Sequence, residues 1–95
     1  MAESTVDDLS IEYSEDGQVL VKQLDKKVLT KGAWSTIMYK FQDWNKAKEE
    51  YGPPKFTIRR YQKRNGEYFQ KSKFNISSVD QAKSVIAALE EWIKE

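Results

Sequence analysis

The stretch GPPKFTIRRYQKRNG, residues 52–66, is the feature that most limits how this chain can fold. Its two prolines cannot donate to a central sheet ladder, so the chain enters the following segment from a stiff, extended lead-in. Asn65-Gly66 supplies the positive φ angles of a tight hairpin turn. The β-branched and aromatic run between these signals predicts a strand at about 55–61, and a partner strand follows at about 67–76. The stretch therefore predicts an antiparallel hairpin.

Two further strands are expected before this hairpin. Residues 18–29 follow Asp16-Gly17, which is a strong turn signal, and begin with alternating apolar residues. Residues 34–44 are rich in the β-branched and aromatic residues that favour strands. Residues 9–14 also alternate, so they form either an additional strand or a tail that leads into the sheet. The sequence thus predicts four strands, or five.

A helix is expected at the C-terminus. Ser78 with Gln81 makes a capping box, and Ser77 with Asp80 is an alternative one. Apolar residues then recur at helical spacing and form a stripe wider than one sheet face would cover. The stripe consists of Val79, Ala82, Val85, Ile86, Ala88, Leu89, Trp92 and Ile93. The predicted fold is α+β, an antiparallel sheet with one helix over one face, and the wide stripe predicts a homodimer.

Charge is strongly segregated along the chain. The formal charge is −6 over residues 1–21, +9 over 22–76 and −2 over 77–95, although the whole chain carries only +1. We expect an acidic N-terminal segment at 1–17, either partly flexible or an extra strand, and one domain at 18–95. A basic middle of this size is typical of proteins that bind a polyanion. The alternative is a solvated surface of mixed charge, and we favour the polyanion because the bases lie in predicted strands.

The composition argues against an enzyme. The chain contains no His and no Cys, so the usual proton shuttle, thiolate nucleophile and zinc ligands are missing. Its acidic residues are scattered, and its four glycines form no phosphate-binding loop. We therefore expect no catalytic residues, no metal and no cofactor or small-molecule substrate. No apolar run approaches the roughly 20 residues of a membrane helix, so a cytoplasmic location is expected, nucleoid-associated in a bacterium.

Strand alternation predicts which residues lie on the sheet face turned away from the helix. On the third strand, where Phe56 and Ile58 should face the helix, the outward residues are expected to be Lys55, Thr57, Arg59 and Tyr61. On the fourth strand they are expected to be Phe69, Lys71, Lys73 and Asn75. A register slip of one residue would instead turn Phe69 inward. The second strand is less clear, and we favour the arrangement with Lys40 outward.

Cations beside flat rings on an open sheet suit single-stranded nucleic acid, whose phosphates and unstacked bases are both accessible. Trp34 is either a stacking platform or a ring that covers a strand end. We expect largely sequence-independent binding of single-stranded DNA or RNA in transcription, replication, recombination or repair. The alternative is a protein-interaction module whose basic sheet docks an acidic partner. The acidic N-terminal segment could compete with nucleic acid for the basic face.

A family resemblance agrees with this prediction. The succession KGAW, GPPKFTIRRY and SKFNIS before a capped helix resembles bacterial and phage relatives of the transcriptional coactivator positive cofactor four, over about residues 18–95. The part from RYQKRNGEYF onward is also similar to purine-rich-element-binding repeats, and both belong to the Whirly-like single-strand binders. The resemblance implies a curved four-stranded sheet, a homodimer formed through the helices, and DNA lying across the sheet. By position it implies nucleic-acid contacts from Lys31, Trp34, Lys55, Arg59 and Tyr61.

Overall fold

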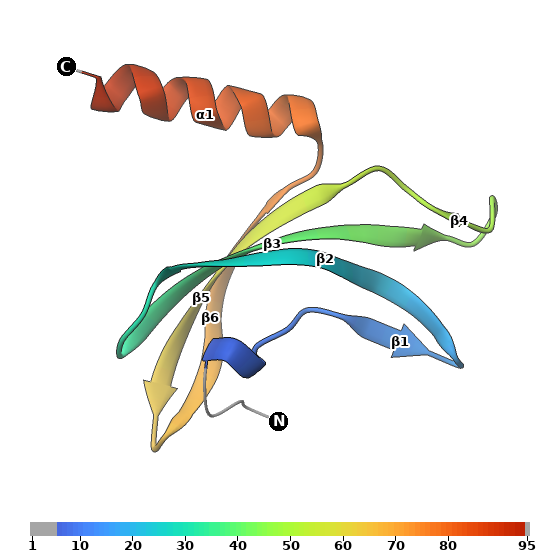
Figure 1. The fold of residues 1–95 in the computed structure, drawn as a ribbon, viewed down its shortest axis with the longest axis horizontal. Helices are drawn as coiled ribbons and strands as arrows, with labels where there is room; N and C mark the ends of the chain where they lie inside the picture. Colours follow the sequence, from blue (N-terminus) through green and yellow to red (C-terminus); the bar gives the residue numbers. More distant parts are fainter. Residues whose placement is uncertain (1–5, 95) are drawn as a thin grey trace.

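The computed structural model describes residues 6–94 as a curled antiparallel sheet followed by one helix (Figure 1). The α+β class, the antiparallel sheet and the C-terminal helix are therefore confirmed. Residues 1–5 of the acidic segment, and Glu95, lie outside the described residues. The elements are η1 (Val6–Asp8), β1 (Tyr13–Glu15), β2 (Gln18–Thr30), β3 (Trp34–Asn45), β4 (Glu50–Tyr51), β5 (Lys55–Arg64), β6 (Glu67–Ile76) and α1 (Val79–Ile93).

The sheet has the order β1-β2-β3-β5-β6, and the short β4 pairs with β3. Two of its hairpins turn where the sequence predicts. Asp16 and Gly17 have φ angles of 51° and 82°, and Asn65 and Gly66 have φ angles of 53° and 80°. Positive φ at both central residues is what a two-residue turn between twisted strands requires. The optional fifth strand exists as β1, but it covers only Tyr13–Glu15.

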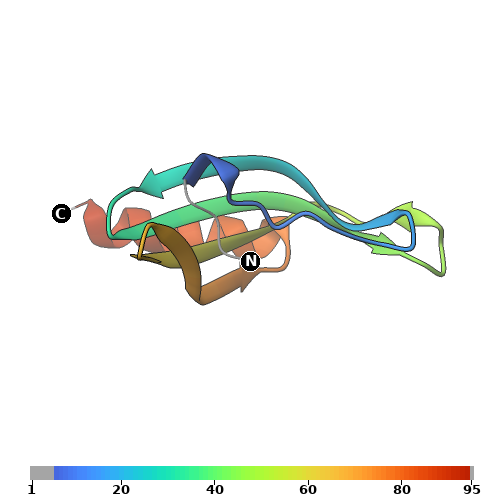
Figure 2. The same ribbon diagram turned by 90° about the horizontal axis from the view of Figure 1, so that it is seen from below.

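The curl gives the sheet two distinct sides (Figures 1 and 2). We call the side that carries Ile37 and Tyr39 the concave face, and the side that carries Met38 and Lys40 the convex face. In Figure 1, η1 lies inside the curl and α1 stands outside it. Cross-strand pairing assigns the neighbouring strands, because residues directly opposite each other share a face.

A bulge in β6 changes the predicted faces. Arg60 pairs with Ser72, but the next residue, Tyr61, pairs with Gln70, so Lys71 is the extra residue. An extra residue swaps the sheet faces of all the strand residues that precede it. Phe69 was predicted on the outward face with Lys73, but it pairs with Gln62 and lies on the convex face. The favoured placement was therefore wrong, and the alternative in which a slip of one residue turns Phe69 to the other face is the one observed.

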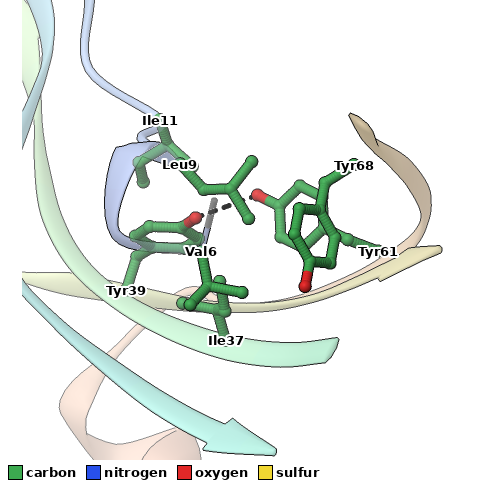
Figure 3. Close-up of a cluster of buried hydrophobic side chains, with 7 residues drawn as sticks. All are labelled: Val6, Leu9, Ile11, Ile37, Tyr39, Tyr61 and Tyr68. Atoms are coloured by element: carbon green, nitrogen blue, oxygen red, sulfur yellow. Dashed lines mark hydrogen bonds between the residues drawn. The ribbon is translucent and has the colours of Figure 1, made fainter. Parts of the chain in front are cut away.

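The core lies on the concave face and is completed by the N-terminal segment (Figure 3). We call residues 6–12 the strap. Its buried side chains Val6, Leu9 and Ile11 pack in one cluster with four side chains of the sheet, namely Ile37, Tyr39, Tyr61 and Tyr68. Burial of this apolar surface is a main stabilising term for so small a domain.

The helix does not cover the sheet, contrary to the prediction. The capping box is confirmed, since Ser78 Oγ accepts from Gln81 N at 3.1 Å. However, no side chain of α1 is buried, and Trp92 and Ile93 are 72% and 76% exposed. The predicted apolar stripe therefore exists, and residues 6–94 do not bury it. Within residues 6–94, no helix combines the length and apolar character needed to cross a membrane.

Candidate nucleic-acid interface

Four of the nine predicted contact residues share the concave face. Lys55 pairs with Phe41, and Arg59 pairs with Ile37 on one side and Lys73 on the other. Tyr61 lies two residues beyond Arg59 on the same strand. These side chains come from β5 and β6, which are joined by the Asn65-Gly66 turn. The hairpin that the sequence predicts is thus what brings the cations together.

The remaining five lie elsewhere. Lys40 pairs with Phe56 and Asp25 on the convex face, so the favoured arrangement with Lys40 on the same face as Arg59 was wrong. Trp34 pairs with Gln62 and lies on the convex face with Phe69. Lys71 is the bulge residue of β6, and Lys31 lies in the turn between β2 and β3.

Trp34 forms a cation–π pair within the chain. The Arg60 guanidinium lies over its ring, 4.7 Å from the centroid, and the side chain is 42% exposed. Such cation–π pairs at exposed sites contribute about 0.5–1 kcal/mol. Both residues belong to the convex face, so the pair is separated from Arg59 and Lys73 by the sheet itself.

Tyr61 is covered, which corrects the expectation that its ring is open for stacking. Its side chain is 5% exposed beneath the strap, and its hydroxyl lies 2.9 Å from the Tyr39 hydroxyl. Burial raises the pKa of Tyr39 far above its ordinary value, and the bond to Tyr61 adds to the rise. The Tyr39 hydroxyl therefore stays neutral. Tyr68, which sequence analysis missed because of the bulge, joins the same cluster.

Beside the strap, a groove of about 310 Å³ remains open on the concave face. The strap borders it through Ile11. Its other lining residues come from β2, β3, β5 and β6 and include Val21, Phe41, Asp43, Lys55, Arg59 and Asn75. The groove thus combines an aromatic ring with cations, which is the composition that the sequence predicted for this face.

The two cations of the groove differ in their partners. Lys55 Nζ lies 2.8 Å from Asp43 Oδ2, and both side chains are more than a third exposed. A pair this exposed contributes at most about 1 kcal/mol and can exchange for another anion. Arg59 Nη1 donates to Gln70 Oε1 at 3.0 Å, while its buried Nε has no partner among the described residues. Arg59 therefore has donor capacity left for an anionic ligand.

Comparisons of this chain with protein-family models, with curated proteins and with solved structures found no match. The resemblance to relatives of positive cofactor four remains a prediction from the sequence.

Proposed function

We propose that the protein binds single-stranded nucleic acid along the concave face, with backbone phosphates held by Arg59, Lys73 and Lys55. The observation that carries this proposal is the Arg59 guanidinium, which borders an open groove and whose buried Nε has no partner among the described residues. A buried donor left without a partner costs free energy, and a turn of the side chain toward the groove would bring Nε within reach of a phosphate oxygen in a charge-assisted bond. The half-buried ring of Phe41 supplies an apolar contact for a base.

A single strand fits this surface better than a duplex. The groove presents cations and a ring together, and only unpaired bases offer their flat faces beside their phosphates. Largely sequence-independent binding follows, because every base has such a face. Roles in transcription, replication, recombination or repair are consistent with this activity, and either DNA or RNA can supply the chemistry.

Fluorescence anisotropy tests the proposal with a labelled thymidine oligomer, a uridine oligomer and a DNA duplex of equal length. We expect both single strands to bind more tightly than the duplex. Three phosphate contacts predict a slope of log K against log salt of about −2 for single strands. Equal affinity for the duplex, with a slope near zero, would contradict the proposal.

A second candidate function is supported by the strap itself, an acidic peptide of the same chain that lies on the concave face. The protein would then be an interaction module whose basic face docks an acidic protein partner. Titration with labelled polyglutamate distinguishes the two candidates. Binding of polyglutamate without measurable affinity for any oligonucleotide would favour the interaction module.

We also propose that the protein forms a homodimer in which a second copy covers α1 and the convex face. The helix leaves its apolar stripe exposed, and Phe74 on the convex side of β6 is 54% exposed. Contiguous apolar surface of this kind is uncommon on soluble monomers and marks association sites. In a dimer with a twofold axis, each copy can cover the helix stripe and the convex face of its partner.

Replacement of Trp92 by glutamate is expected to convert the dimer into a monomer, because it places a charge at the most exposed ring of the stripe. Size-exclusion chromatography with light scattering should give twice the chain mass of 11.1 kDa for the unchanged protein and the single mass for Trp92→Glu. Lys83→Glu, an exposed change on the same helix, is the matched control and should stay dimeric. A monomeric unchanged protein would contradict the homodimer.

A further inference from the structure

We infer that the strap is an autoinhibitory segment that covers a platform of three tyrosines, and that single-stranded nucleic acid displaces it. This inference rests on the proposed function, because the displacing strand is the ligand proposed above. The strap occupies the concave face directly beside the groove that holds Arg59, and its residue Ile11 lines both the core cluster and the groove (Figure 3).

The surface beneath the strap has the composition of a base-stacking site. Tyr39, Tyr61 and Tyr68 come from three successive neighbours of the sheet, β3, β5 and β6, and all lie in the cluster that the strap covers. Each is less than 10% exposed while the strap is in place. Stacking of a base on such a ring contributes roughly 1–3 kcal/mol, so an uncovered platform would add substantially to the affinity.

The strap is attached to β2 by two side chains of that strand and by its own Glu12, whose Oε1 accepts from Gln23 N at 3.2 Å. Lys26 Nζ donates to the backbone carbonyls of Val6, Asp7 and Leu9 at 2.7, 3.1 and 2.7 Å. Gln23 Oε1 accepts from Ile11 N at 3.1 Å and from Ser10 Oγ at 3.0 Å. Regular strand pairing begins only at Tyr13. Opening of the strap therefore breaks side-chain hydrogen bonds and the core contacts of Val6, Leu9 and Ile11, but it leaves the strand pairing of the sheet intact.

Charge makes nucleic acid a suitable competitor. The strap carries Asp7, Asp8 and Glu12, so a polyanion that approaches the groove is repelled while the strap is closed. Opening removes that repulsion and frees the Lys26 ammonium from three neutral carbonyls. A phosphate would then make a stronger, charge-assisted bond with it. Closure and binding therefore exclude each other at Lys26 and at the tyrosines.

The first test loosens the strap without changing any charge. In the double variant Val6→Ser with Leu9→Ser, anisotropy is expected to show at least about fivefold tighter binding of the thymidine oligomer. The apparent Kd is the intrinsic Kd divided by the fraction of open protein, and the variant raises that fraction. Tyr13→Ser is the control, because this ring is 51% exposed and lies outside the cluster. Unchanged affinity in the double variant would overturn the inference.

The second test keeps the strap nearly intact and uses the absence of cysteine from the chain. A thiol reagent should label Leu9→Cys slowly in the free protein, because Leu9 is 5% exposed, and faster with saturating thymidine oligomer. Ser14→Cys, exposed on the neighbouring strand β1, should label at the same rate with and without the oligomer. Continued protection of Leu9→Cys in the bound protein would mean that the strap stays closed.

The outcomes separate the inference from the proposed function. If no variant, including the one with the loosened strap, binds an oligonucleotide, the proposed function fails and the inference falls with it. If the unchanged protein binds but Leu9→Cys stays protected and the double variant binds no tighter, only the strap inference fails.

Discussion

Replacing Arg59 with glutamate is expected to weaken binding of a thymidine oligomer by about tenfold to a hundredfold. A hydrogen bond to a charged group contributes about 1.5–3 kcal/mol, and each 1.4 kcal/mol is a factor of about ten in affinity. The reversed charge also repels the phosphate that Arg59 would otherwise hold. Anisotropy titration at low salt measures the change, and circular dichroism checks that the fold is retained.

Two further variants make the Arg59 result specific. Lys48→Glu changes the net charge by the same amount but lies in the turn between β3 and β4, so it should weaken binding far less. Arg59→Lys keeps the charge but loses the Nε donor that has no partner among the described residues. It should therefore fall between the unchanged protein and Arg59→Glu. If Lys48→Glu weakens binding as much as Arg59→Glu, the affinity depends only on the net charge of the protein, and the groove is not the binding site.

The parts of the fold that sequence analysis predicted correctly depend on local chemistry. Asn65-Gly66 and Asp16-Gly17 fix their turns because few other residue pairs adopt positive φ at both positions. The helix begins at Val79 because Ser78 satisfies a free backbone N–H there. Each of these signals lies within a few residues of the feature it determines, so one sequence is enough to recognise it.

The errors depend on contacts that are distant in the sequence. Nothing in the strand EYFQKSKFNI marks Lys71 as a bulge, yet this one residue decides that Tyr68 rather than Phe69 joins the concave face. The strap has only three apolar residues without a regular period, so its sequence does not indicate that it completes the core. The helix stripe was therefore assigned to the sheet, and Tyr61 was expected to be open.

Replacing Tyr39 with alanine is expected to lower the free energy of unfolding by about 3–5 kcal/mol, as for other large buried aromatic residues. Tyr39 is fully buried, and its loss would leave a cavity and remove the partner of the Tyr61 hydroxyl. The expected loss is a large share of the roughly 5–15 kcal/mol by which small domains are stable. Urea denaturation followed by tryptophan fluorescence measures it.

Two milder variants separate the contribution of the buried Tyr39 ring from that of its hydroxyl and from that of an exposed ring. Tyr39→Phe keeps the ring and should cost about 1–3 kcal/mol, because it leaves the buried Tyr61 hydroxyl without this partner. Tyr13→Ala removes an exposed ring and should change stability little. If Tyr39→Ala costs no more than Tyr13→Ala, the ring of Tyr39 is already open to solvent, and the strap does not close over it. A large loss in Tyr39→Ala with a smaller one in Tyr39→Phe means that packing of the ring in the core cluster contributes more to the stability of the concave face than the hydroxyl pair does.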